Sequence, residues 1–223
     1  MSKFNMISID GNIGSGKSTL MGELEIYFKD NKNVIFLKEP TEDWKCITDE
    51  NGITILEKFY ENPTKYGFSF QIMAYISRLN TMKEAIKQNP TAIFITERSL
   101  FTDKLVFAKM LFDSGNIELI NYRIYLQWFN TFAEDFPVSK VIYVNTAPEI
   151  CHQRILKRSR TGESNIPLEY LENCHKYHTD MLDVNSKDCV CKEQLVLDGN
   201  IDIYENKEQL SEWIEKINTF IHN

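Results

Sequence analysis

A chain of 223 residues, of which 43% are hydrophobic, can bury one sizeable core. Its formal net charge of -7 argues against a surface for nucleic acid or anionic membrane, because both favour basic faces. No apolar run approaches the roughly 20 residues of a membrane-spanning helix, so we expect one domain over residues 1–223 with neither nucleic acid nor membrane as a partner.

The first residues run directly into a strand-like segment. Residues 1–6 carry neither the apolar region of a signal peptide nor an Arg- and Ser-rich transit segment. The five cysteines are odd in number and scattered along the chain, so reduced thiols are the expected state. These features favour a cytoplasmic protein.

Short apolar runs alternate with longer amphipathic stretches. The strand candidates, most of them apolar enough to be buried on both faces, are 4–9, 34–37, 92–96, 141–145 and 194–198. The helical stretches are 18–28, 68–88, 103–112, 117–132 and 149–158. A last helix places one stripe of apolar residues at Leu210, Trp213, Ile214, Ile217 and Ile221. This alternation predicts an α/β fold with a five-stranded parallel sheet flanked by helices.

The first strand candidate leads into a complete phosphate-binding motif, G-x-x-x-x-G-K-[ST], which predicts a nucleoside triphosphate site. Glycines let backbone N–H groups turn toward phosphate oxygens, and the following helix adds the positive end of its dipole. Lys17 is expected to reach the β- and γ-phosphates, and the Ser18 hydroxyl to hold Mg²⁺. The residues of this P-loop and its continuation are Gly11, Asn12, Ile13, Gly14, Ser15, Gly16, Lys17, Ser18 and Thr19.

Two other nucleotide-binding classes lack their signatures. A dinucleotide fingerprint needs a third glycine, but Gly16 is followed by Lys17, Ser18 and Thr19. A signalling GTPase needs N-K-x-D, and the nearest string, residues 31–34, ends in Val34 instead of aspartate.

Charged residues follow the second and third strand candidates. In open α/β sheets, ligands bind beyond the carboxyl ends of the strands, where Glu39 and the pair Glu97-Arg98 fall. Glu39 could take the proton of an attacking hydroxyl, and the pair could contact Mg²⁺ or hold the reacting oxygen. The alternatives are an exposed loop glutamate and a surface ion pair.

One predicted helix face mixes residue types unsuited to a core. Gln71, Ala74 and Arg78 stand at i, i+3 and i+7 and therefore share a face. This face can form a hydrogen-bonding wall for a nucleobase, with Ala74 leaving room for it, or it can be a solvated stripe.

Positive charge gathers near the end of the stretch 149–158. Arg154, Lys157 and Arg158 stand at i, i+3 and i+4, with Arg160 just beyond. Arginines there can close over a triphosphate and stabilise the transferring phosphoryl group. The alternative is a basic helix face without a role.

A cluster of metal-ligand types lies further along the chain. Cys174, His175 and His178 precede Cys189 and Cys191. Their spacings match no common zinc template, and the two groups fall on different predicted elements. We therefore expect ordinary packing and no metal site in this cluster.

Taken together, these residues resemble the deoxynucleoside kinase family, in particular its deoxycytidine, deoxyguanosine and deoxyadenosine kinases. The likeness covers nearly the whole chain and implies a P-loop kinase fold with a short arginine-rich lid at about residues 154–165. Beyond the P-loop, it rests on Glu39-Pro40 with Trp44, Phe68-Ser69-Phe70-Gln71, Ser77-Arg78, Glu97-Arg98-Ser99 and residues 166–171.

The resemblance implies roles for the residues singled out above. Glu39 is the implied general base for the 5′-hydroxyl of a deoxyribonucleoside, with Arg98 also holding that hydroxyl and Glu97 placing Mg²⁺ beside Ser18. The 3′-hydroxyl is assigned to Tyr60 and Glu163, and Tyr60 also crowds the 2′ position. The implied nucleobase contacts are Gln71 at the edge, Phe107 stacked on the ring, and Ile13 and Trp44 along the wall. The implied ATP contacts are Arg154, Arg158 and Arg160 in the lid, and Asp202 and Ile203 around adenine.

The same resemblance bears on the choice of nucleobase. In the family, an Arg and an Asp at the positions of Arg78 and Asp103 accompany deoxycytidine and purine deoxynucleosides. An ionised Asp103 only accepts hydrogen bonds, which suits an amino group or a ring N–H and not the O4 of thymine. We therefore expect deoxycytidine, deoxyadenosine or deoxyguanosine to be preferred over thymidine.

Three alternative functions accompany this prediction, and one oligomeric state is expected. The first alternative, an ATPase-coupled binding module, would hydrolyse ATP without any dependence on a nucleoside. A thymidylate-type nucleoside monophosphate kinase shares sheet and P-loop, but Glu39 would repel its acceptor phosphate. A non-catalytic kinase-like subunit would be expected to lose the lysine or the base, which are present here. By family likeness we expect a homodimer through the helices 68–88 and 117–132, with contacts from Tyr122, Tyr125, Trp128 and Phe129, although these aromatic residues could equally be core.

Overall fold

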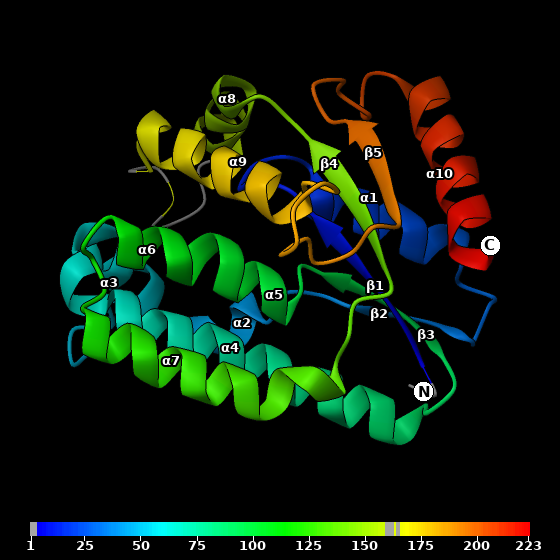
Figure 1. Ribbon diagram of the computed structural model, residues 1–223. Coiled ribbons are helices and arrows are strands. Elements are labelled where there is room, and N and C mark those ends of the chain that lie inside the picture. The colour runs from blue at the N-terminus through cyan, green and yellow to red at the C-terminus, as the bar shows by residue number, and fades with distance from the viewer. Residues whose placement is uncertain (1–3, 159–162, 164–165) are drawn as a thin grey trace.

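The computed structural model describes residues 4–158, 163 and 166–223 (Figure 1). Within them, one parallel sheet has the strand order β2-β3-β1-β4-β5. Its strands are β1 Asn5–Asp10, β2 Val34–Leu37, β3 Ile93–Glu97, β4 Lys140–Asn145 and β5 Gln194–Asp198. The predicted five-stranded parallel sheet is confirmed, and each strand end lies within one residue of its predicted place.

Helices cover both faces of this sheet. The long ones are α1 Lys17–Tyr27, α4 Pro63–Gln88, α7 Leu119–Phe132, α8 Pro148–Arg158, α9 Leu168–Leu182 and α10 Lys207–His222. The short segments are α2 Thr41–Lys45, α3 Ile55–Glu61, α5 Leu100–Thr102, the π-helix η1 Asp103–Ala108, α6 Lys109–Asp113 and the 3-10 turn η2 Ala133–Asp135. No helix was predicted at α2, α3 or α9. A capping box of Thr54 and Glu57 begins α3, and this pair was a readable signal in the sequence.

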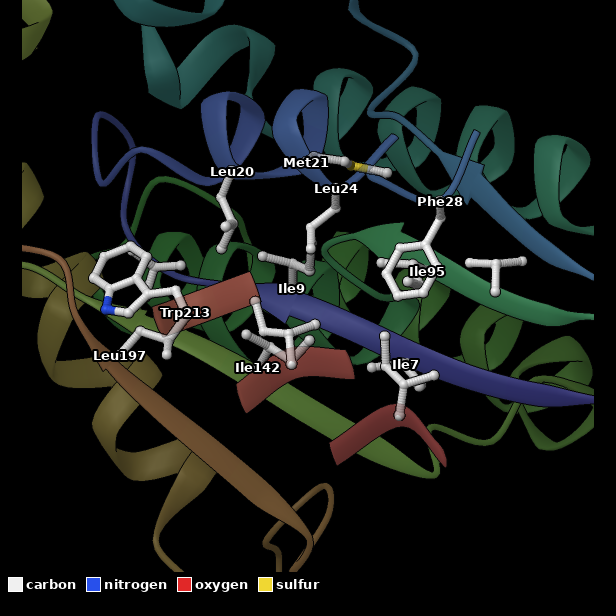
Figure 2. Close-up of a cluster of buried hydrophobic side chains, with 14 of the residues drawn as sticks. Ile7, Ile9, Leu20, Met21, Leu24, Phe28, Ile95, Ile142, Leu197 and Trp213 are labelled. Atoms are coloured by element: carbon white, nitrogen blue, oxygen red, sulfur yellow. The ribbon is translucent and has the colours of Figure 1, made fainter. Parts of the chain in front are cut away.

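The core has one layer on each side of the sheet. Helices α1 and α10 pack on one face, where Leu20 and Leu24 meet Ile9 and Ile142, and Trp213 closes the end of the cluster (Figure 2). Helices α4 and α7 cover the opposite face with η1 (Figure 1). Burial from both sides explains why the strands read as nearly continuous apolar runs.

Of the potential metal ligands in the C-terminal half, Cys174 and His178 are fully buried. Each of the five cysteines is a free thiol. His178 is fully buried on α9 and its Nδ1 lies 2.7 Å from the carbonyl oxygen of Cys174. Burial lowers the pKa of His178 to about 3, so the ring is neutral.

Among the described residues, no helix combines the length and apolar character needed to cross a bilayer.

Candidate active site

The P-loop forms a tight turn between β1 and α1. Gly11 and Gly14 have φ of +150° and +79°. A Cβ on Gly11 would lie 2.6 Å from the carbonyl oxygen of Val144, and one on Gly14 would lie 2.6 Å from that of Cys151. Both positions therefore need glycine for backbone conformation and for space. Residues 13–19 of the turn line the cavity at the start of α1, and the N-terminus of a helix is a site for phosphate oxygens.

Lys17 is the cation inside this turn. Its ammonium donates to the carbonyl oxygen of Asn12 at 2.6 Å, and the side chain is buried. Burial, helped by the guanidinium of Arg98, lowers the pKa of Lys17 to about 7 against the opposing effect of Glu97 and Glu39. The site thus holds a desolvated cation next to the place where the motif binds phosphate.

A hydroxyl and a carboxylate meet at the mouth of the P-loop. Ser18 Oγ, at the start of α1, donates to Glu97 Oε1, at the end of β3, at 2.5 Å. Such oxygens are the donors that Mg²⁺ prefers, so the pair fits the predicted metal role. A second acid escaped the sequence analysis: Asp10, at the end of β1, accepts from Ser8 Oγ and Thr102 Oγ1, both at 2.5 Å.

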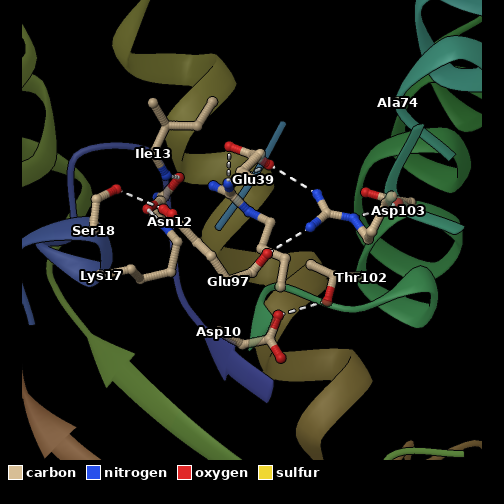
Figure 3. A network of polar contacts seen from close by, with 12 residues as sticks. Asp10, Asn12, Ile13, Lys17, Ser18, Glu39, Ala74, Glu97, Thr102 and Asp103 are labelled. Carbon is tan, nitrogen blue, oxygen red and sulfur yellow. Dashed lines mark hydrogen bonds and ion pairs between the residues drawn. The ribbon is translucent and has the colours of Figure 1, made fainter. Parts of the chain in front are cut away.

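Glu39 lies between two arginines (Figure 3). Arg98 Nη1 donates to both of its carboxylate oxygens, at 2.9 and 3.0 Å, and Arg78 Nη2 donates to Oε1 at 2.9 Å. Arg98 has φ of +63°, a left-handed conformation at the strand end, and its N–H donates to the carbonyl oxygen of Ile9. Burial alone would raise the pKa of Glu39, but the two guanidiniums and the Lys17 ammonium lower it to about 2.

Arg78 continues this network to η1. Its Nε donates to Asp103 Oδ2 at 2.9 Å, and its Nη1 donates to the carbonyl oxygen of Glu97 at 2.5 Å. Burial raises the pKa of Asp103 even though Arg78 opposes this shift. The loop after β2, helix α4 and π-helix η1 thereby bring together Glu39, Arg78 and Asp103, which lie far apart in the sequence.

A single cavity of about 450 Å³ joins the two halves of the site. The P-loop, from Ile13 to Thr19, forms one end, and Glu39, Glu97 and Arg98 lie along it. The predicted acceptor residues that line the cavity are Ile13, Trp44, Tyr60, Gln71, Ala74, Asp103, Phe107 and Glu163. The predicted ATP residues that line it beyond the P-loop are Arg154, Arg158, Asp202 and Ile203. Gly11, Asn12 and Arg78 do not line it, although Arg78 forms ion pairs with the lining residues Glu39 and Asp103; Arg160 falls outside the described residues.

Aromatic rings shape the acceptor end. Trp44 Nε1 donates to Ser77 Oγ at 2.9 Å, and its ring packs edge-on against Phe70. The guanidinium carbon of Arg98 lies 5.1 Å from the centre of the Phe107 ring. Burial, with the nearby Glu163 carboxylate, raises the pKa of Tyr60, so its hydroxyl remains a donor. The walls suit a flat, uncharged ring.

The arginines at the other end make contacts within the protein. Arg154 Nη1 donates to the carbonyl oxygens of Gly199 at 2.8 Å and Ser15 at 3.4 Å, which connects the P-loop to the loop after β5. Arg158 Nε donates to Glu163 Oε2 at 3.0 Å. Sequence reasoning missed Phe59 and Tyr204, which also line the cavity and belong to no motif.

The fold and the site define a P-loop phosphotransferase. The sequence pattern described as deoxynucleoside kinase matches residues 7–222, so the chain belongs to the deoxynucleoside kinase family. This confirms the resemblance and makes the chain an ATP-dependent deoxynucleoside kinase.

Individual relatives agree with the family assignment. A fowlpox virus protein described as a probable deoxycytidine kinase is 33% identical over 217 residues, which are 96% of this chain and 87% of that protein. Deoxycytidine kinase 2 of Gallus gallus is 33% identical over 246 residues, covering 98% of this chain and 91% of that protein. Human mitochondrial thymidine kinase 2 is 29% identical over 182 residues, covering 81% of this chain and 65% of that protein.

Proposed function

We propose that this kinase prefers deoxycytidine, deoxyadenosine or deoxyguanosine over thymidine, and that it serves nucleotide salvage. The Arg78–Asp103 ion pair at the cavity carries this proposal. A carboxylate fixed by a guanidinium accepts hydrogen bonds, so an exocyclic amino group satisfies it and the O4 of thymine leaves it unmatched. The relatives named as deoxycytidine kinases support the same preference.

The reaction we propose is an in-line displacement at the γ-phosphorus. Glu39 takes the proton of the 5′-hydroxyl while that oxygen bonds to phosphorus and the bond to the ADP oxygen breaks. Arg98 holds the 5′-hydroxyl beside Glu39, and Lys17 binds the β- and γ-phosphates. Ser18 and Glu97 would hold Mg²⁺, which neutralises phosphate charge when bound. The protein contributes mainly position and charge.

The sugar and the base have separate contacts in this proposal. Tyr60 and Glu163 bind the 3′-hydroxyl, and Tyr60 excludes a 2′-hydroxyl. The aromatic wall of Trp44 and Phe107 stacks on the base. Gln71, buried at 2% exposure, hydrogen-bonds to the base edge. An apolar slot with few polar groups at fixed places is typical of a selective small-molecule site.

The donor base is assigned to the opposite end of the cavity. Asp202 and Ile203, in the loop after β5, surround adenine, and Arg154, Arg158 and Arg160 belong to the lid over the phosphates. The contacts of Arg154 to Gly199 and Ser15 support a role at the junction of the adenine loop and the P-loop.

We further propose a homodimer, located in the cytoplasm. Helix α7 exposes Leu119, Ile120, Ile124 and Trp128, and α4 exposes Ile76, which a second copy could cover. Of the contacts predicted from sequence, Tyr125 and Phe129 are instead buried within the chain, 1% and 3% exposed. Sedimentation equilibrium distinguishes dimer from monomer.

A panel of acceptors tests the proposed function. The four deoxynucleosides and their 5′-monophosphates are compared with ATP and Mg²⁺ at equal concentrations. We expect the highest kcat/KM with deoxycytidine or a purine deoxynucleoside. A preference for thymidine contradicts the proposed selectivity, and turnover of thymidylate but of no nucleoside favours the monophosphate kinase alternative.

A further inference from the structure

The guanidinium of Arg78 is shared by two carboxylates with different roles. It contacts Glu39, the proposed base, at 2.9 Å on one side and Asp103, the proposed reader of the nucleobase, at 2.9 Å on the other. The carbonyl oxygen of Glu97 holds its third donor. Arg78 itself is 3% exposed, so its contacts are protected from solvent screening.

This arrangement leaves Glu39 poorly suited to accept a proton. Oε1 receives hydrogen bonds from both Arg78 and Arg98, and Oε2 receives one from Arg98. Each of these bonds stabilises the ionised carboxylate and lowers its basicity, as the low pKa of Glu39 reflects. An efficient general base needs a higher proton affinity than this contact set allows.

Of the two arginines, Arg78 is the one whose hydrogen bond to Glu39 a bound nucleobase can replace. Arg98 lies beside the proposed 5′-hydroxyl position, and within the part of the chain that the structure describes Glu39 is the one carboxylate that accepts its side-chain hydrogen bonds. Arg78 already bonds to Asp103, which lines the cavity at the acceptor end. A nucleobase there adds ring nitrogens and carbonyl oxygens that compete with Glu39 for the guanidinium.

We propose that Arg78 is a positioning residue that couples nucleobase recognition to the base: a nucleobase that bonds to the Arg78–Asp103 pair draws the guanidinium from Glu39. Oε1 then keeps one hydrogen bond, from Arg98, in place of two, and can accept another from the 5′-hydroxyl. This inference rests on the proposed function. It makes the rate of phosphoryl transfer, and not only binding, depend on the polar edge of the nucleobase.

An acceptor without polar base atoms tests this coupling. In 1,2-dideoxy-1-phenylribose a phenyl ring fills the base pocket and the sugar is unchanged. Single-turnover rates at saturating acceptor isolate the chemical step from product release. For the wild-type protein we expect the phenyl compound to react at least about tenfold more slowly than deoxycytidine, as expected when general-base efficiency falls.

Arg78→Met should reduce the difference between the single-turnover rates with deoxycytidine and with the phenyl compound, which is called the gap below. It should raise the rate with the phenyl compound about tenfold, because Glu39 regains basicity. In Arg78→Met the buried Asp103 carboxylate loses its partner, which can prevent folding. The double variant Arg78→Met with Asp103→Asn removes that charge and replaces the single variant if it does not fold. Arg78→Lys, which retains charge, should retain most of the gap. Lys83→Met, at an exposed cation on the same helix, is the matched control and should behave as wild type.

Two outcomes overturn the inference. One is an equal rate for the phenyl compound and deoxycytidine in the wild-type protein. The other is a rate difference of the same size in the wild-type protein, in Arg78→Met and in Arg78→Met with Asp103→Asn, which is the result expected of a purely structural arginine. Failure of the proposed function looks different: no deoxynucleoside is phosphorylated, or Glu39→Gln reacts at the wild-type rate.

Discussion

Ser18 Oγ and Glu97 Oε1 lie 2.5 Å apart, although 79 positions separate them in the chain. Parallel pairing of β1 with β3 brings their carboxyl ends to the same edge of the sheet, where the P-loop and the end of β3 meet. A hydroxyl and a carboxylate at this separation offer two hard oxygen donors in front of the P-loop.

Removing the carboxylate of this pair should weaken the binding of Mg²⁺. We expect Glu97→Ala to raise the Mg²⁺ concentration for half-maximal activity by roughly 10–100-fold, as is typical when a group that positions or binds a metal is lost. A magnesium titration at saturating nucleoside measures this change. Asp113→Asn, which changes an acid on α6 outside the cavity, is the control. An unchanged magnesium requirement removes Glu97 from the metal role.

Glu39→Gln tests the proposed base. The amide keeps the shape of the side chain but cannot take the proton, so turnover should fall by roughly 10²–10⁴-fold. Nucleoside binding, measured by calorimetry, should persist. Glu42→Gln, an exposed acid on the neighbouring helix α2, is the matched control. Full turnover in Glu39→Gln shows that another group, or water, accepts the proton.

The buried ammonium of Lys17 predicts a pH effect on ATP binding. Its pKa of about 7 means that the side chain loses its proton as the pH rises through 7, with Arg98, Glu97, Glu39 and Cys151 as the charged or titratable neighbours. The phosphates of MgATP stabilise the ammonium, so binding at pH 8 should take up a proton and weaken as the pH increases further. Calorimetry in two buffers with different ionisation enthalpies measures the uptake. Lys17→Met should abolish it, and binding without proton uptake in the wild type contradicts the prediction.

Selectivity should follow the Arg78–Asp103 pair. Arg78→Met together with Asp103→Ala removes the acceptor that leaves thymine unmatched, so kcat/KM for thymidine should rise relative to deoxycytidine. The change should be at least about tenfold, the scale expected when a buried polar mismatch is relieved. Steady-state kinetics with both nucleosides measure the ratio. A double variant with the wild-type ratio would mean that selectivity depends on another wall of the cavity.

Sequence alone predicted the sheet and the P-loop because their signals are local. A run of apolar residues and an eight-residue motif need no knowledge of distant partners. Arg78 shows the limit: its helix face placed it with Gln71 and Ala74, which line the cavity, but Arg78 itself does not line it and instead pairs with Glu39 and Asp103, which do. Its three acceptors come from three other segments, and only the folded chain brings these together. Tyr204 was missed for a different reason: an exposed tyrosine in a loop belongs to no sequence pattern.

The glycines of α1 and its P-loop offer a test of the local backbone. Gly14→Ala adds a Cβ that would lie 2.6 Å from a backbone carbonyl at φ of +79°, so both strain and contact oppose it. Gly22, within α1, has nothing within 4 Å of the same atom. Gly22→Ala should therefore stabilise the fold by about 0.5–1 kcal/mol through helix propensity, whereas Gly14→Ala should destabilise it by roughly 1–3 kcal/mol.

Urea unfolding of the two alanine variants measures the change in the free energy of unfolding, which should have opposite signs in the two. ATP binding provides a second readout. Gly14→Ala should also weaken ATP binding, because the turn that directs the N–H groups has to shift. Gly22→Ala should bind ATP as the wild type does, since the added Cβ has no heavy atom of another residue within 4 Å. Equal stability and equal ATP affinity in both variants would show that the backbone at Gly14 relaxes freely, and that the shape of the phosphate turn does not depend on glycine at this position.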